Sequence, residues 1–280
     1  LAPAMNVHMY ENVATQTNLA RLQEMGYELL EPASGRLACG TEGKGRLPDL
    51  AVMQEKLTAL LLPKQDLVGK KVLVTAGPTQ EPIGPVRYLT NRSSGKMGYA
   101  IAKAAAARGA QVVLVSGPVV LPAPPNVRLV SVRTAEEMKE AVLAEYEQMD
   151  IVIKAAAVAD YRVINPSTTK IKKTTQNEQM TLHLERNPDI LKLLGRQKKH
   201  QILVGFAAET DHLLEYAAKK LQEKNLDLIV ANDVAQTDAG FDVDTNIITI
   251  LYPDGRKTAY EKCKKEVAAD HILNAVAALL

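Results

Sequence analysis

Short runs of consecutive apolar residues alternate with longer stretches of helical periodicity from residue 71 onward. Four such runs are KVLVTAG, QVVLVSG, DIVIKAAAV and QILVGFAAE. Runs that are apolar on both faces are typical of strands buried between two layers of helices. Helices are predicted between them at residues 98–109, 134–148 and 212–225, and Thr134 with Glu137 forms a capping-box pattern. We therefore predict an α/β fold, a Rossmann-like and mostly parallel sheet with helices on both faces.

The two ends of the chain add elements to this pattern. Residues 227–233 predict another strand, residues 246–261 a terminal hairpin that turns at PDG, and residues 264–279 a last helix. The first part predicts helices over 12–25 and 50–62, a short strand over 27–30 and a glycine-rich loop over 35–49.

A polar stretch that begins with proline, PKQDLVGK at 63–70, separates the two patterns. Such a stretch is typical of a linker. We place the domains at 1–66 and 67–280. The opening LAPAMN resembles the end of a buried segment, so we expect the chain to start inside a domain.

Ligands of open parallel sheets bind beyond the carboxyl ends of the strands. This rule selects the loops that follow Val74, Ile153, Val204 and Val230. The first of them runs to Gly98, much longer than the usual connection of about two to six residues, which is typical of a functional loop.

The first loop contains NRSSGKMG but neither of the common nucleotide-binding glycine patterns. A Walker loop needs glycine at Thr90 and a hydroxyl at Met97. The dinucleotide pattern G-x-G-x-x-G is also absent, since Gly77 is followed by Pro78 and Thr79. These departures disfavour a Walker-type NTPase and an ordinary dehydrogenase.

The same loop still has the residues of an anion site. Ser93, Ser94 and Gly95 precede a helix, and a helix N-terminus attracts negative charge. The alternative is that Ser94 only caps the helix. Arg87 and Asn91 favour the anion site, because a guanidinium and an amide hold carboxylate or phosphate oxygens.

The second loop places three alanines before Asp160, which allows a ligand to approach the backbone closely. Asp160 is a candidate acceptor for a base or a ligand of magnesium, or else a helix cap. Lys170, Lys172 and Lys173 follow in TTKIKK. They are either a solvated charge run or a mobile loop that closes over negative charge.

Further candidates lie in the last loops. Asn187 and Pro188 precede a short helix and are predicted to cap it. Phe206 ends a strand and is either a core residue or part of a site. Lys220 and Lys224 lie one turn apart on a helix, and solvent exposure is the simpler interpretation.

Composition limits the class of protein. With 280 residues, 46% of them hydrophobic, and a net charge of +2, the chain is globular, and its charge does not favour nucleic acid or membranes as partners. Two distant cysteines, Cys39 and Cys263, suit a reducing compartment, so we expect a cytoplasmic protein. No run reaches the roughly 20 apolar residues of a membrane span.

Seven ordered motifs together resemble phosphopantothenate-cysteine ligase, the synthetase half of the bifunctional coenzyme A biosynthesis flavoproteins. They are TAGPTQEPIGPVRYLTNRSSGKMG, AAAVADYR, KIKK, NPDI, VGFAAET, KNLDLIVAND and GFDVDTN, between Lys71 and the C-terminus. Upstream, PAMN and GRLACGTEGKGR resemble the C-terminal part of phosphopantothenoylcysteine decarboxylase. The resemblance implies a complete ligase domain and a partial decarboxylase domain.

The resemblance implies a two-step reaction. The carboxylate of 4'-phosphopantothenate attacks the α-phosphate of CTP, which gives an acyl-cytidylate and pyrophosphate, and the amine of cysteine then displaces CMP. Mg²⁺ would offset charge on the phosphates. The family is dimeric through this domain, and the full-length bifunctional parent assembles further through its flavoprotein domain.

The same resemblance assigns roles to single residues. Asn91, with Arg87 nearby, matches the residue that holds the acyl-cytidylate, and Lys170 matches the lysine of the flexible flap. The matches to the CTP site are Lys154, Ala155, Ala156, Asp160, Pro188, Asp189, Ile190, Leu191, Phe206, Lys220 and Lys224.

In the first domain, Asn6 matches the asparagine that contacts the substrate carboxylate, and Cys39 matches the reducing cysteine of the decarboxylase. The flavin-binding strands and the catalytic histidine of that family are absent from this sequence. We therefore expect FMN and decarboxylation only in a full-length parent. Two rival hypotheses are an NADP-dependent Rossmann-type reductase and a non-catalytic scaffold or regulatory subunit, and CTP-dependent pyrophosphate release separates all three.

Overall fold

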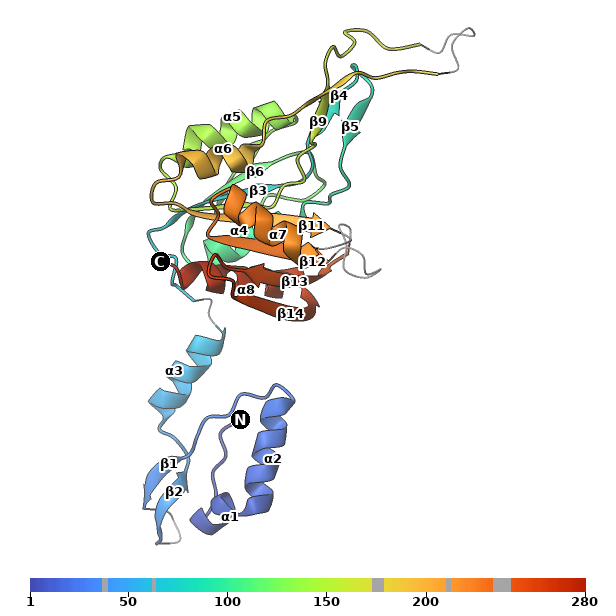
Figure 1. Cartoon of the computed structure of the whole chain (residues 1–280). Coiled ribbons are helices and arrows are strands. Elements are labelled where there is room, and N and C mark those ends of the chain that lie inside the picture. The colour runs from blue at the N-terminus through green and yellow to red at the C-terminus, as the bar shows by residue number, and fades with distance from the viewer. Residues whose placement is uncertain (37–39, 62–63, 173–178, 210–212, 234–242) are drawn as a thin grey trace. The chain divides into compact units, whose positions relative to one another are not determined.

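A computed structural model describes residues 1–36, 40–61, 64–172, 179–209, 213–233 and 243–280 (Figure 1). The chain divides into two compact units, Leu1–Lys64 and Gln65–Leu280. The division falls two residues before the one placed from the sequence. No helix in the described part of the chain is both long and apolar enough to span a membrane.

Unit 1 holds α1 (Val7–Glu11), α2 (Val13–Glu24), the hairpin of β1 (Ala33–Arg36) with β2 (Glu42–Arg46), and α3 (Leu50–Leu61). The strand predicted over 27–30 is wrong, since these residues form no strand. The sequence also missed the hairpin, because glycines replace the alternating apolar residues that usually mark strands. A Cβ on Gly45 would lie 2.2 Å from the carbonyl oxygen of Met5, so glycine is needed for this close contact.

Unit 2 is built on an eight-stranded sheet with the order β14-β13-β12-β11-β8-β3-β6-β7. Its parallel strands are β3 (Lys71–Ala76), β6 (Gln111–Ser116), β7 (Val127–Ser131), β8 (Ile151–Lys154), β11 (Ile202–Glu209) and β12 (Leu228–Asp233). The antiparallel hairpin of β13 (Thr245–Leu251) and β14 (Lys257–Lys264) extends one side. The predicted fold class is confirmed, and only β7 was not anticipated.

Helices cover both faces of this sheet (Figure 1). On one face α4 (Lys96–Ala107) and α8 (Lys265–Ala277) pack over buried residues of the strands, such as Val74, Ile153 and Ile250. On the other face lie α5 (Ala135–Tyr146), α6 (Ile190–Gln197) and α7 (Leu213–Glu223). The predicted capping box at Thr134 is present at the start of α5.

Two small hairpins form an arm that projects from the carboxyl edge of the sheet (Figure 1). One consists of β4 (Gln80–Pro82) and β5 (Tyr88–Thr90), the other of β9 (Tyr161–Val163) and β10 (Leu184–Arg186). Both lie within segments that the sequence predicted as loops, because three-residue strands are too short to show a period. Strands β4 and β9 contact each other, so the two long loops form one structure.

Candidate functional site

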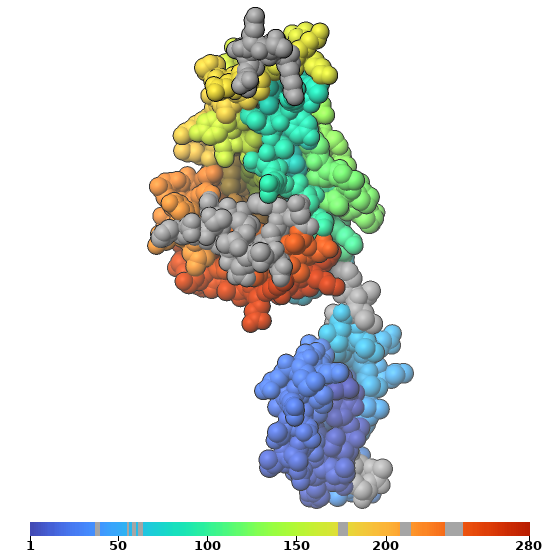
Figure 2. Space-filling view, turned by 90° about the vertical axis from the view of Figure 1, so that its right-hand side faces the viewer, coloured from blue at the N-terminus to red at the C-terminus, as the bar shows by residue number. Residues whose placement is uncertain are grey.

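Two adjoining cavities open at the carboxyl edge of the sheet in unit 2. We call them the lysine cavity, of about 460 Å³, and the serine-loop cavity, of about 560 Å³. Both volumes are typical of sites for small molecules. Ala156 and Phe206 line both cavities, so the two spaces meet at these side chains. Figure 2 looks onto this edge and shows a recess between the β5–α4 segment (turquoise) and α7 (orange).

The lysine cavity brings together most residues that the sequence assigned to nucleotide binding. Lys154 ends β8, and Lys220 and Lys224 come from α7. Phe206 forms a wall from within β11, which continues to Glu209, so the prediction that Phe206 ends its strand is wrong. Other predicted residues that line it are Ala156, Asp160, Pro188, Asp189, Ile190 and Leu191. Ala155 lines the serine-loop cavity instead. Three lysines around one space favour a ligand with several negative charges.

Lys154 has an unusual electrostatic environment. Burial lowers its pKa to about 8, and repulsion from Lys224 adds to this effect, while attraction by Asp189 and Asp160 opposes it. Its ammonium makes no hydrogen bond or ion pair with another described residue, although its backbone belongs to the sheet. An ammonium held in this way gains a strong partner when an anion enters the cavity.

Asp189 fixes the position of Lys224. It is the N-cap of α6, where its carboxylate accepts a hydrogen bond from the backbone N–H of Lys192 at 3.0 Å. It also lies 2.9 Å from Nζ of Lys224. Burial would raise the pKa of Asp189, but these two partners outweigh it and the pKa is lowered. The prediction that Asn187 and Pro188 cap this helix is wrong, because the cap is one residue later.

The serine-loop cavity lies at the N-terminus of α4. Gly95 is the N-cap of this helix with φ of 76°, so Ser94 does not occupy the cap position. A Cβ on Gly95 would lie 2.8 Å from Val119 Cγ1, which adds a steric reason for glycine. Ser93 Oγ accepts a hydrogen bond from the backbone N–H of Gly95 at 3.3 Å. Ser93, Ser94 and Gly95, which the sequence predicts as an anion site, all line the cavity.

Asn91 also lines the serine-loop cavity. Its side-chain amide donates a hydrogen bond to the carbonyl oxygen of Val158 at 3.1 Å, which joins the β5–α4 loop to the loop after β8. The contact orients the Asn91 side chain at the carboxyl edge, near the place where the two cavities meet.

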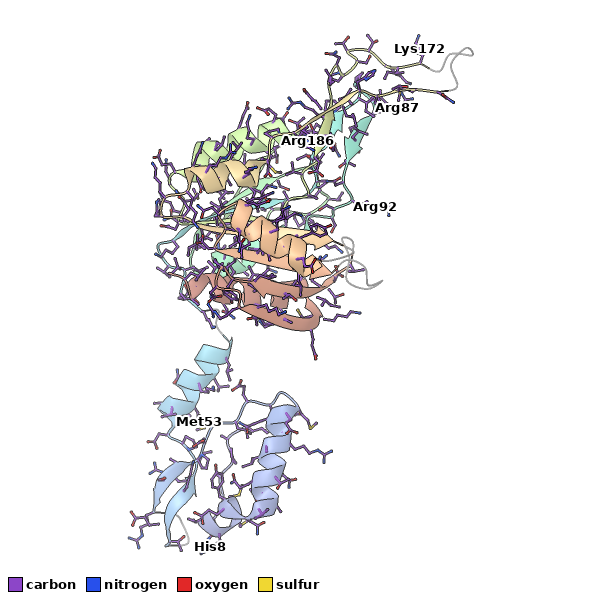
Figure 3. All side chains as sticks on the ribbon, in the orientation of Figure 1. His8, Met53, Arg87, Arg92, Lys172 and Arg186 are labelled. Atoms are coloured by element: carbon purple, nitrogen blue, oxygen red, sulfur yellow. The ribbon has the colours of Figure 1, made fainter. Side chains whose placement is uncertain are left out.

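Arg87 and Lys170 lie outside both cavities. Arg87 Nη1 donates a hydrogen bond to the carbonyl oxygen of Ile171 at 3.1 Å, so Arg87 holds the residue that follows Lys170. Figure 3 shows Arg87 and Lys172 toward the far end of the arm and Arg186 nearer the sheet. Lys173 lies outside the described residues. The structure thus places the predicted flap lysine on the arm rather than in a cavity wall.

Sequence reasoning missed three buried polar residues of the serine-loop cavity. Asn232, Asn246 and Lys265 line it, and their exposed fractions are 9%, 2% and 5%. The Oδ1 atoms of both asparagines have no hydrogen-bond partner within the described part of the chain. The sequence could have indicated that Asn246 is buried, because it occupies the same face of its strand as the buried Ile248 and Ile250.

The metal prediction rests on Asp160 alone. No group of three or more His, Cys, Asp or Glu side chains that would hold a metal occurs among the described residues. Asp160 lines the lysine cavity, beside the space for an anion. One carboxylate fits a magnesium ion that takes its other ligands from phosphates and water, as such ions commonly do.

The two residues of unit 1 that the sequence assigned to a flavin-dependent decarboxylase are Asn6 and Cys39. Asn6 is the N-cap of α1, and its side chain accepts a hydrogen bond from the backbone N–H of His8 at 2.8 Å. Cys39 lies outside the described residues. Among the described side chains of this unit none that is polar is buried, so these residues do not fit a flavin by themselves.

Comparisons with known proteins agree with the architecture. Residues 67–280 match the DNA/pantothenate metabolism flavoprotein C-terminal domain, and residues 1–62 match the Flavoprotein family. The crystal structure of the C-terminal domain of a coenzyme A biosynthesis bifunctional protein CoaBC superposes with a TM-score of 0.67 at 45% identity. It covers 77% of this chain and 98% of that one.

The sequence of this chain is also similar to longer curated proteins. The coenzyme A biosynthesis bifunctional protein CoaBC of Bacillus subtilis is 51% identical over 100% of this chain and 69% of its own length. The protein of the same name from Escherichia coli K12 is 49% identical over 91% of this chain and 63% of its own length. The chain therefore belongs to the family of bifunctional coenzyme A biosynthesis proteins, with the DNA/pantothenate metabolism flavoprotein C-terminal domain as its larger unit.

Proposed function

We propose that unit 2 is a CTP-dependent phosphopantothenate-cysteine ligase. The observation that carries this proposal is the pair of cavities that meet at Ala156 and Phe206. Such a pair suits an enzyme that joins the reacting ends of two anionic substrates. An NADP-dependent reductase is disfavoured, because the loop after β3 has no dinucleotide glycine pattern.

CTP would occupy the lysine cavity, where Lys154, Lys220 and Lys224 favour the charge of a triphosphate. 4'-Phosphopantothenate would occupy the serine-loop cavity, with its phosphate at the N-terminus of α4. Its carboxylate would then reach the junction at Phe206, next to the α-phosphate of CTP. This arrangement places the nucleophile and its target side by side before the reaction.

In the first step a carboxylate oxygen attacks the α-phosphorus, the bond to the bridging oxygen breaks, and pyrophosphate leaves. Lys154 and Lys170 would offset the negative charge that builds on the α-phosphate, Lys170 after movement of the arm. Asn91 would orient the carboxylate and hold the acyl-cytidylate by its amide N–H. A magnesium ion with Asp160 as one ligand would neutralise the phosphate oxygens.

In the second step the amine of cysteine attacks the acyl carbonyl carbon, and the bond to the phosphate oxygen of CMP breaks. The cysteine nitrogen loses a proton and the products are an amide and CMP. CMP is a better leaving group than hydroxide, because its negative charge spreads over phosphate oxygens. The first step therefore makes the second possible at neutral pH.

The full-length parent would combine this ligase with an FMN-dependent phosphopantothenoylcysteine decarboxylase, since residues 1–62 match the Flavoprotein family. Cys39 and Asn6 would belong to that second activity. We also propose a cytoplasmic homodimer that associates through unit 2, which sedimentation of residues 65–280 would test.

The decisive assay is pyrophosphate release from CTP and Mg²⁺ with 4'-phosphopantothenate, with and without cysteine, and with ATP in parallel. We expect release that depends on the acid and prefers CTP, and an amide product only when cysteine is present. Oxidation of NADPH in a matched assay would support the reductase instead. A folded chain that binds neither CTP nor the acid would favour a scaffold.

A further inference from the structure

Two buried acceptors in one cavity have no hydrogen-bond partner among the described residues. Asn232 is the last but one residue of β12, and Asn246 lies near the start of β13, the neighbouring antiparallel strand. An unpaired buried polar atom costs about 1–3 kcal/mol, so two of them close together call for an explanation. Both residues line the serine-loop cavity, and both of their Oδ1 atoms lack a hydrogen-bond donor within the described residues.

Strand β13 and a contact with α4 hold the Asn246 side chain in place. Its side-chain amide lies 3.2 Å from Sδ of Met97, in the first turn of α4, which leaves only the oxygen unpaired. The pairing of β13 with β14 shifts register between Asn246 and Ile248. The extra residue lies on β14, so Asn246 keeps its place on the same face as Ile248 and Ile250.

The charge of the cavity limits the ligand. Lys265 is buried in the same wall, and its ammonium donates a hydrogen bond to the carbonyl oxygen of Val243. A positive charge and the N-terminus of α4 favour an anionic ligand at this end. An amide oxygen accepts a hydrogen bond from such a ligand without the repulsion that a carboxylate would cause.

We propose that Asn246 determines specificity for the acid substrate by accepting a hydrogen bond from an N–H or O–H group in its middle. This inference rests on the proposed function. The acid has two such donors between its phosphate and its carboxylate, a secondary hydroxyl and an amide N–H. Asn232 offers the second acceptor, so the number of unpaired oxygens equals the number of donors.

This role makes Asn246 a binding residue distant from the reacting atoms. Loss of its oxygen should raise KM for the acid with little change in kcat and no change in KM for CTP. An acid without a matching donor should be rejected, because its binding would leave the oxygen unpaired.

The test uses pyrophosphate release by the full chain with three acids. They are 4'-phosphopantothenate, an analogue without the secondary hydroxyl, and an analogue with an ester in place of the amide. In the wild type we expect one analogue to lose roughly tenfold in kcat/KM. Asn246→Leu should lose roughly tenfold with the natural acid and nothing further with that analogue.

Thr249→Val is the matched control, because Thr249 lies on the same strand with its side chain on the opposite face. This variant should behave as the wild type with all three acids. Asn246→Leu should also unfold at the same temperature or higher, since it removes an unpaired buried atom. If the leucine variant does not fold, Asn246→Ala gives the same comparison of acids.

Several results would overturn the inference. One is an Asn246→Leu protein in which each analogue loses as much kcat/KM, relative to the natural acid, as it does in the wild type. Another is a strongly lowered unfolding temperature without substrate in both Asn246→Leu and Asn246→Ala, which would assign the oxygen a structural partner. A wild type that binds no 4'-phosphopantothenate in calorimetry would remove the proposed function together with this inference, so the two failures are distinguishable.

Discussion

Lys154 is expected to lower the stability of the protein while it helps to bind the nucleotide. Its side chain is partly buried and repelled by Lys224, and the pKa is about 8 rather than the ordinary 10.5. Replacing it by methionine keeps an unbranched side chain of similar length and removes the charge. We predict that Lys154→Met stabilises the free protein at pH 7 and weakens the binding of CTP.

The magnitude follows from the pKa. The difference between 10.5 and about 8 corresponds to roughly 3 kcal/mol, at about 1.36 kcal/mol for each pH unit. This value is the upper limit for the gain, because the side chain and nearby water relax around the charge. For CTP we expect KM to rise on the order of tenfold or more, since a hydrogen bond to a charged group is lost.

The pH dependence of stability tests independently whether the Lys154 charge destabilises the fold. The folded pKa of Lys154 lies below the unfolded one, so between pH 8 and 10.5 the unfolded chain binds the proton and the folded chain does not. Stability of the wild type should therefore rise with pH across this window. The advantage of Lys154→Met should be full below pH 8 and should disappear as the pH approaches 10.5.

Urea unfolding followed by circular dichroism at pH 7, 8, 9 and 10 measures these differences. Lys192→Met is the control, because Lys192 is an exposed lysine on α6, and we expect its effect to stay within about 0.5 kcal/mol at every pH. A Lys154→Met protein that is less stable than the wild type at pH 7, or equally shifted at all four pH values, would refute the reasoning.

Three further changes test other parts of the structure. Lys170→Gln should lower pyrophosphate release about 100-fold or more, because a neutral amide does not offset charge on the α-phosphate; a near-normal rate would remove Lys170 from the mechanism. Asn91→Asp should lower turnover about tenfold or more through repulsion of the intermediate's phosphate, and unchanged turnover would show that the loop is misassigned. Thr134→Ala should cost about 1 kcal/mol in urea unfolding, because it removes the capping box of α5, and a loss below about 0.3 kcal/mol would contradict this.

The sequence was sufficient for the central sheet because buried strands carry a strong local signal. The runs at β3, β6, β8 and β11 are apolar on both faces. Three of them match their strands within one residue, whereas β8 ends at Lys154, before the alanines of its run. The hairpins of the arm were missed, since β4 and β9 have three residues each and take their order from contact with each other. Contacts between distant segments leave no periodic pattern in either one.

The site could be predicted only in part for the same reason. Lys154, Asp160 and Asn91 follow strand ends or precede a helix, and the rule for parallel sheets selects such positions. Asn246 and Lys265 come from the antiparallel extension and from α8, which no rule for strand ends selects. Their importance depends on burial and on missing hydrogen bonds, which only the folded chain shows.

The common wall of the two cavities also has a consequence for inhibitors. Because Ala156 and Phe206 border both spaces, one molecule can fill both without a long tether. Linking two weak ligands makes the second contact intramolecular, so affinity can increase by about 100-fold or more without any new contact. A stable cytidine conjugate of the acid, with a sulfonyl group in place of the phosphate, should therefore bind much more tightly than either half, and a bulkier side chain at Ala156 should abolish that advantage while leaving each half able to bind.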